Sequence, residues 1–181
     1  MGGYFFLLGL AFLFIEMAFI QKFILFLSHP LYSVAVVLAG FLVFAGLGSA
    51  YSGKAARRSQ APVYSPLLLA VSGIAIIVVT YIFLLPHLFD QLIGLADSLK
   101  IAISLALIAP LAFCMGMPFP LGLRQVAGTA PDFIPWAWGI NGFASVISAA
   151  LATLLAIQFG FTFVLLAALV LYGSSVLLFR Q

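Results

Sequence analysis

The chain has 181 residues, of which 66% are apolar and only 6% are charged, and its mean hydropathy is +1.32. This composition excludes a soluble globular domain, and the formal charge of +3 comes from too few ionised groups to indicate nucleic-acid binding. The sequence therefore predicts an all-α, polytopic integral membrane protein. A β-barrel is not expected, because the alternating strands of about ten residues that it requires are absent.

Apolar runs of about 20 residues can each cross roughly 30 Å of hydrocarbon as an α-helix. The sequence predicts six such spans within a single transmembrane domain, residues 1–181: 4–27, 31–51, 65–85, 100–117, 136–157 and 161–179. After the third span, charged residues among apolar ones at helical spacing predict a short interfacial helix near 87–98. The first span carries Glu16 at its middle and has no basic start, so we interpret it as a membrane span and not a signal peptide.

The connection between the fourth and fifth spans carries the strongest local signals. Pro118 and Pro120 lack backbone donors, so the fourth helix should end or bend just before them, at a helix–loop–helix corner. Pro135 suits a first helical turn. Trp136 and Trp138 beside it are typical of anchors at a membrane–water interface.

Basic residues are distributed unevenly between the two sides of a six-span topology. One side would hold five and the other two, namely Lys54, Arg57, Arg58, Arg124 and Arg180 against Lys22 and Lys100. The positive-inside rule then predicts a multi-pass protein of the bacterial inner membrane with both termini in the cytoplasm.

Three polar side chains interrupt the spans. Glu16 lies near the bilayer midplane, where a charged carboxylate is expensive. Two interpretations stay open for it: a proton or substrate site, or a protonated carboxyl that hydrogen-bonds between helices. Gln21 and Asn141 are interpreted as groups that hydrogen-bond between helices and take no part in chemistry.

Basic side chains at the cytoplasmic face are further candidates for binding. They are Lys54, Arg57, Arg58 and Arg124. We interpret Arg124 first as a snorkelling anchor, with a lipid headgroup, a soluble partner or an acidic substrate as the alternative ligand. On the outer side, His87 and Asp90 are too few to predict a metal site.

The sequence contains no glycine-rich nucleotide-binding motif, no cysteine–histidine cluster and no paired histidines for haem. We therefore expect no catalytic residue, no metal site and no cofactor held by this chain, which should not be an enzyme. Bound lipids, and pigments or quinones held by partners, stay open.

Small residues predict where helices approach one another closely in lipid. The second and fifth spans each carry such a stripe: Ala35, Ala39, Gly46 and Ala50, and Ala144, Ser148 and Ala152. These two helices are expected to be central, and the third and sixth to face lipid or a partner.

Four segments together resemble the membrane portion of the large bacterial spermidine synthase-like proteins. They are residues 6–30, 44–49, 115–124 and 134–142. The resemblance implies relation to the major facilitator superfamily, whose basic loop would fall on residues 49–58 with Gly53 in place of the usual aspartate. These 181 residues hold no counterpart of the soluble aminopropyltransferase-like domain of that family, so its catalytic residues are not implied here.

Three functions are compatible with these features. The first is a non-catalytic subunit or anchor that docks to protein partners in a larger membrane assembly. The second is a half-transporter of major-facilitator ancestry that acts as a dimer. The third is a membrane module for a separately encoded cytoplasmic spermidine synthase-like enzyme. The expected partners are membrane lipids, other membrane subunits and, in the third case, one soluble cytoplasmic protein.

Overall fold

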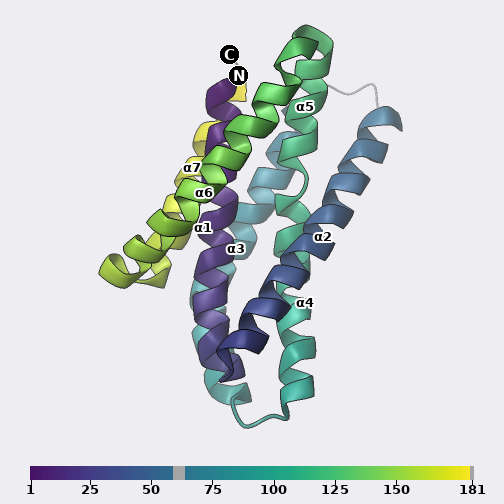
Figure 1. The fold of residues 1–181 in the computed structure, drawn as a ribbon. Coiled ribbons are helices and arrows are strands. Elements are labelled where there is room, and N and C mark those ends of the chain that lie inside the picture. Colours follow the sequence, from purple (N-terminus) through teal and green to yellow (C-terminus); the bar gives the residue numbers. More distant parts are fainter. Residues whose placement is uncertain (59–63, 180–181) are drawn as a thin grey trace.

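The computed structural model describes residues 1–58 and 64–179, with the side chains of residues 1–54 and 64–179. The described residues form helices and turns, with no strand. The helices are α1 (Gly2–Leu27), α2 (Pro30–Arg58), α3 (Tyr64–Leu92), α4 (Asp97–Met115), α5 (Pro118–Thr129), the short 3₁₀ helix η1 (Pro131–Phe133), α6 (Ile134–Phe159) and α7 (Phe161–Phe179). Six segments in this part of the chain are long and apolar enough to cross a membrane, α4 and α5 together forming one of them. The predicted multi-pass helical bundle is confirmed (Figure 1).

The interfacial helix predicted near 87–98 is wrong. α3 continues through Pro86 to Leu92, and the chain turns before α4 begins at Asp97. The physical reason is packing, because Phe89 extends the buried face of α3 and its ring stacks on Phe26 at a centroid distance of 4.3 Å. Proline is tolerated in membrane helices when neighbouring helices support the backbone.

The helix break before Pro118 is confirmed, but the corner that follows is helical. α4 ends at Met115, and α5 begins at Pro118, whose missing N–H suits a first helical position. The loop expected at this corner is thus mainly the 12-residue helix α5. Pro135 lies in the first turn of α6, as expected.

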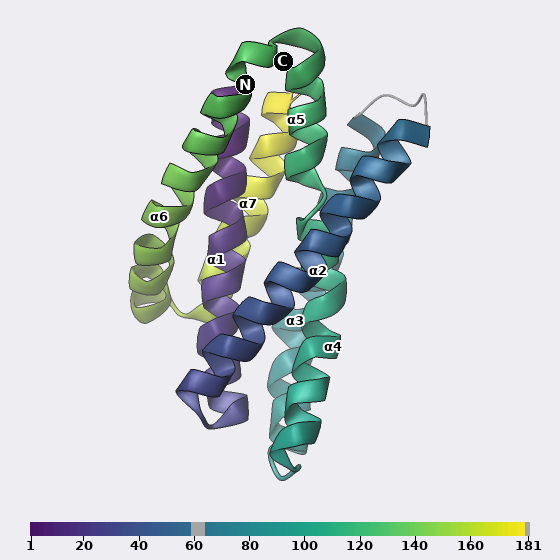
Figure 2. The same cartoon turned by 45° about the vertical axis from the view of Figure 1, so that its right-hand side comes forward.

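The central helix is α1, and the prediction that the second and fifth spans are central is wrong. α1 packs mainly against α6, α7 and α2, while α2 packs mainly against α4. In the most apolar window of α1, 61% of residues are buried, against 28% for α2 and 17% for α6. Figure 2 shows α6 on one side of α1, α7 on the other, and α2 crossing near the lower part of α1. We expected the third and sixth spans to face lipid or a partner, but they are at least as buried as the second and fifth. In their most apolar windows, 28% and 33% of the residues are buried.

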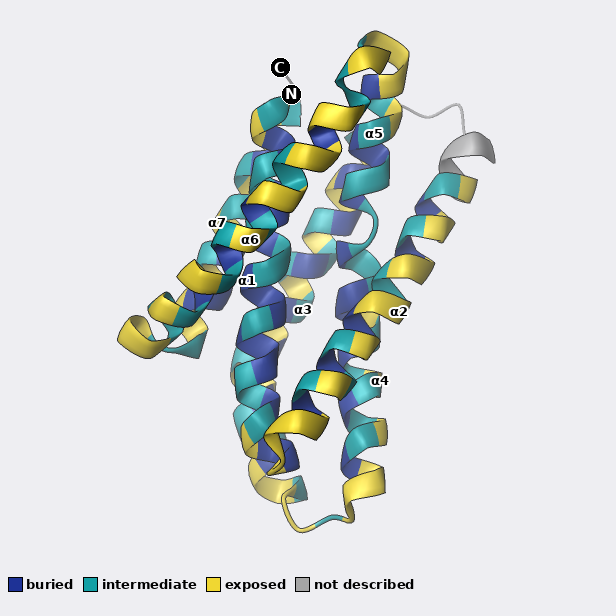
Figure 3. Ribbon diagram, viewed as in Figure 1, coloured by how far each residue is buried: buried dark blue, intermediate teal, exposed yellow. Residues whose placement is uncertain are grey.

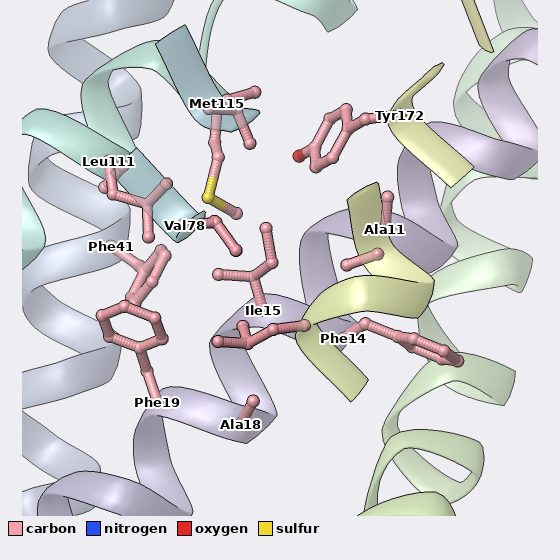
Figure 4. Close-up of a cluster of buried hydrophobic side chains, with 14 of the residues drawn as sticks. Ala11, Phe14, Ile15, Ala18, Phe19, Phe41, Val78, Leu111, Met115 and Tyr172 are labelled. Atoms are coloured by element: carbon pink, nitrogen blue, oxygen red, sulfur yellow. The ribbon is translucent and has the colours of Figure 1, made fainter. Parts of the chain in front are cut away.

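Aromatic and aliphatic side chains of α1 form the core with neighbouring helices (Figure 4). Phe19 is fully buried, stacks on Phe23 at 5.6 Å and meets Phe41 of α2 edge-on at 5.6 Å. Tyr172 of α7 points its hydroxyl toward the middle of this cluster. The core therefore joins the helices α1, α2 and α7 near the middle of the bundle.

Two close helix crossings depend on glycine. A Cβ on Gly9 would lie 2.5 Å from the carbonyl oxygen of Asn141, so α1 and α6 touch almost backbone to backbone. At the crossing of α2 and α4, a Cβ on Gly48 would collide with the carbonyl of Phe113, and one on Gly116 with the carbonyl of Ala45. Glycine at these positions permits the close approach on which helix association in lipid relies.

The two small-residue stripes behave differently. The α6 stripe, Ala144, Ser148 and Ala152, is buried, and Ser148 Oγ donates to the Leu10 carbonyl at 2.8 Å, which confirms the prediction for the fifth span. The α2 stripe is exposed along its length, so within the described residues it does not form the helix contact predicted for the second span. It comprises Ala35, Ala39, Gly46 and Ala50 (Figure 3).

Candidate functional site: a cleft between α2 and α6

The start of α1 and the end of α7 lie at one end of the bundle, together with α5 (Figure 1). Arg124 on α5 and Lys54 near the end of α2 are exposed at this end. α2 ends at Arg58, and the side chains of Arg57 and Arg58 lie outside the described residues. Trp136 and Trp138, in the first turns of α6, are exposed as interfacial anchors would be. We call this the termini end.

Glu16 lies on α1 with only 6% of its surface exposed. Within the described chain its carboxyl takes part in no hydrogen bond or ion pair. Tyr172 of α7 is close enough to interact with it electrostatically. A midplane carboxyl without a hydrogen-bonding partner is stable when it is neutral or solvated, because burying an unpaired charge is costly.

The two intramembrane amides differ in what they contact. Asn141 Nδ2 donates to the carbonyl oxygen of Phe5 at 3.0 Å and so links α6 to α1. Gln21 is half-buried, and its side chain forms no hydrogen bond within the described residues. Only Asn141 thus forms the interhelical bond that we expected of both.

A cleft of about 480 Å³ lies near these groups between α1, α2 and α6, closed on its inner side by the break between α4 and α5. Its walls include Phe12, Leu42, Gly46, Met115, Gly116, Pro118, Phe119, Trp138, Asn141, Ser145 and Tyr172. Leu42, Gly46 and Trp138 are exposed on the side of the bundle, so the cleft opens sideways. A ligand would therefore enter from the lipid phase.

Hydrogen-bonding capacity remains inside the cleft. The Asn141 side-chain amide keeps its oxygen as an acceptor, and Ser145 Oγ, which donates to the Asn141 carbonyl at 2.9 Å, can still accept. Tyr172 also lines the cleft. Glu16 follows Phe12 of the cleft wall by one helical turn on the same face of α1, but it does not itself line the cleft.

A second cavity of about 380 Å³ lies between α2 and α5 at the termini end. Its walls are formed by Ser52, Gly53, Pro120, Leu121, Leu123, Arg124, Ala127 and Ile134. Pro120 also lines the cleft, so the two cavities adjoin. Together they can hold an elongated ligand with an apolar part and a charged part.

Charged groups at the opposite end of the bundle are dispersed. Lys22 lies over the ring of Phe161 at 5.3 Å, and Lys100 over that of Phe26 at 5.9 Å. His87 Nδ1 is 3.0 Å from the carbonyl oxygen of its own helix, at Phe83. Across the described residues, no three histidine, cysteine, aspartate or glutamate side chains come together as a metal site would require.

Sequence reasoning identified Asn141 and Arg124 but missed the cleft that lies near both. Ser145, one turn after Asn141 on the same face of α6, was the available signal. Gly48 and Gly116 gave no signal in the sequence, because their role is to let two backbone segments that are far apart in the chain approach closely.

No protein-family model, curated protein or solved structure matches this chain. The resemblance to the spermidine synthase-like membrane proteins accordingly rests on the sequence motifs alone.

Proposed function

We propose that this protein is a non-catalytic membrane subunit that docks a helix of a partner membrane protein on the exposed face of α2. The observation that supports this proposal is the exposed α2 stripe, in particular Ala35 and Ala39, which are four residues apart and uncovered. Small residues spaced in this way let helix backbones approach closely, and close packing is the main source of helix association in lipid.

α2 carries small residues on two faces, and only one face is used within the chain. Gly40 packs against Leu105 and Ile108 of α4, where a Cβ would lie 3.2 Å from each side chain, and Gly48 lies against the α4 backbone. The other face holds Ala35 and Ala39, both exposed. A partner helix packed on Ala35 and Ala39 could approach α2 as closely as α4 does at Gly40 and Gly48.

We further propose a bacterial inner membrane location with the termini end in the cytoplasm. Support comes from Lys54 and Arg124, which lie at that end, and from the end of α2 at Arg58. Lys22 and Lys100 lie toward the opposite end. By the sequence, that end holds fewer basic residues than the termini end.

The test is purification of the chain in a mild detergent, followed by native size analysis and mass spectrometry of what co-migrates. The wild type should migrate with at least one other membrane protein. Ala39→Leu should release that protein, because the larger side chain blocks close approach. Val170→Leu on the exposed face of α7 is the matched control and should retain it.

Other outcomes would contradict the subunit role. A homodimer would favour the half-transporter, and a single soluble enzyme would favour the aminopropyltransferase module. A monomeric wild type, or equal retention by Ala39→Leu and Val170→Leu, would show that the α2 stripe does not bind a helix.

A further inference from the structure

The cleft and the cavity at the termini end adjoin along α2, and we treat the two together as a groove. Both are lined by Pro120 at the start of α5. Both are also lined by α2, which contributes Ser49 to the cleft and Ser52 and Gly53 to the cavity at the termini end. These α2 residues occupy successive turns of one helix. A ligand can therefore extend from one cavity into the other along α2.

The groove is about as long as one leaflet of a bilayer is deep. The stretch of α2 from Leu42 to Gly53 rises about 16 Å as a helix. This is roughly half of a hydrocarbon core of about 30 Å. Because Leu42 lies well inside the span and Gly53 near its end, the groove runs from mid-membrane to the membrane surface.

The chemistry of the groove changes along its length. The inner part has walls of Phe12, Leu42 and Phe119 with a few neutral polar groups and no charged side chain. The outer part carries the exposed guanidinium of Arg124, and Lys54 directly follows Gly53 of its wall. No carboxylate lines either cavity. An apolar channel that ends at a cation is complementary to a lipid chain attached to an anionic headgroup.

We propose that one anionic phospholipid binds along α2, with an acyl chain in the cleft and its phosphate at Arg124. The guanidinium can pair with two phosphate oxygens at once, and this pairing distinguishes an anionic or zwitterionic phosphate from other polar groups. Lys54 attracts the headgroup more strongly when the lipid carries a second negative charge or lacks a choline cation. The lipid enters sideways past Leu42 and Gly46, which are exposed.

Gly46 offers a way to close the groove without disturbing the helix packing. A Cβ at Gly46 would meet nothing within 4 Å, because the space in front of it is the cleft. Leucine at this position would occupy the path of the acyl chain. Gly173 on α7 is an exposed glycine that also has open space in front of it but lies outside the groove, which makes it the matched control.

Ala35 and Ala39, where we place the partner helix, do not line the cleft, whereas Gly46 of the same stripe does. Failure of lipid binding would leave the docking proposal intact, since the two experiments have different readouts. Loss of the partner by Ala39→Leu would likewise leave the bound lipid unchanged.

The experiment uses the full chain, delipidated in detergent and then mixed with equal amounts of phosphatidylglycerol and phosphatidylcholine of the same acyl chains. Native mass spectrometry counts the lipid retained per chain. The wild type should retain one lipid and prefer phosphatidylglycerol. Arg124→Gln should lower the retention of phosphatidylglycerol by roughly tenfold, as expected for loss of one charge-assisted pair. Gly46→Leu should reduce the retention of both lipids.

Two controls separate this site from general attraction to lipid. Lys22→Gln removes a cation at the opposite end, and Gly173→Leu adds bulk on α7; both should bind as the wild type does. Unchanged retention of phosphatidylglycerol by Arg124→Gln, or an equal loss of retention in Lys22→Gln, would overturn the headgroup site. Undiminished retention by a Gly46→Leu variant of normal thermal stability would overturn the placement of the chain.

Discussion

Replacing Gly48 by alanine should force α2 and α4 apart, whereas the same change at Gly46 should be tolerated. The two glycines lie two residues apart in one helix, so the change in helix propensity is the same for both, about 1 kcal/mol in favour of alanine. The surroundings differ completely. A Cβ at Gly48 would collide with the backbone carbonyl of Phe113, while at Gly46 it would meet open space.

The expected magnitude follows from what has to move. The carbonyl of Phe113 belongs to the α4 backbone, so it cannot turn aside as a flexible side chain would, and the helices must separate. Overpacking of this kind costs about 1–3 kcal/mol, and a backbone collision belongs at the upper end of that range. Separation also weakens the contact of Gly116 with Ala45 on the same crossing. We expect Gly48→Ala to be less stable than Gly46→Ala by about 2 kcal/mol or more, a factor of roughly 30 in the folding equilibrium.

The assay is reversible unfolding in mixed micelles, titrated with a denaturing detergent and followed by tryptophan fluorescence. Gly46→Ala should unfold at the same detergent fraction as the wild type or a higher one. Gly48→Ala should unfold at a clearly lower fraction. Agreement of the two variants within about 0.5 kcal/mol, the range of ordinary surface substitutions, would refute the close crossing of α2 and α4.

Three further outcomes are expected. Ser148→Leu should lower the folding yield far more than Val170→Leu, because Ser148 is buried against α1 and Val170 is exposed; similar yields would mean that the α6 face is misassigned. Glu16→Gln should preserve the yield and the native complex size, since it keeps volume and hydrogen-bonding capacity; retained assembly with loss of a cellular function would instead indicate a protonation role. In a cysteine-free background, a cysteine at Gly128 should be inaccessible to a membrane-impermeant label in intact cells and one at Gln91 accessible, and the reverse result would invert the proposed orientation.

The sequence by itself determined the elements that depend on local chemistry. Hydropathy and the thickness of a bilayer set the number and approximate limits of the spans, because each helix must satisfy its own backbone inside lipid. Pro118 predicted the break after α4 for an equally local reason, since it lacks an N–H. The buried stripe of α6 was also readable, because Ala144 and Ser148 are small residues among large ones on one face.

Only the tertiary structure decided which faces of the helices meet one another. Lipid and protein interior are equally apolar, so an apolar pattern does not reveal which side of a membrane helix is buried. α1 is hydrophobic around its whole circumference, and its central position became visible only once α6, α7 and α2 were placed around it. The exposed stripe of α2, the pairing of Gly48 with Phe113 and the groove from Gly46 to Arg124 likewise depend on where distant segments lie in space.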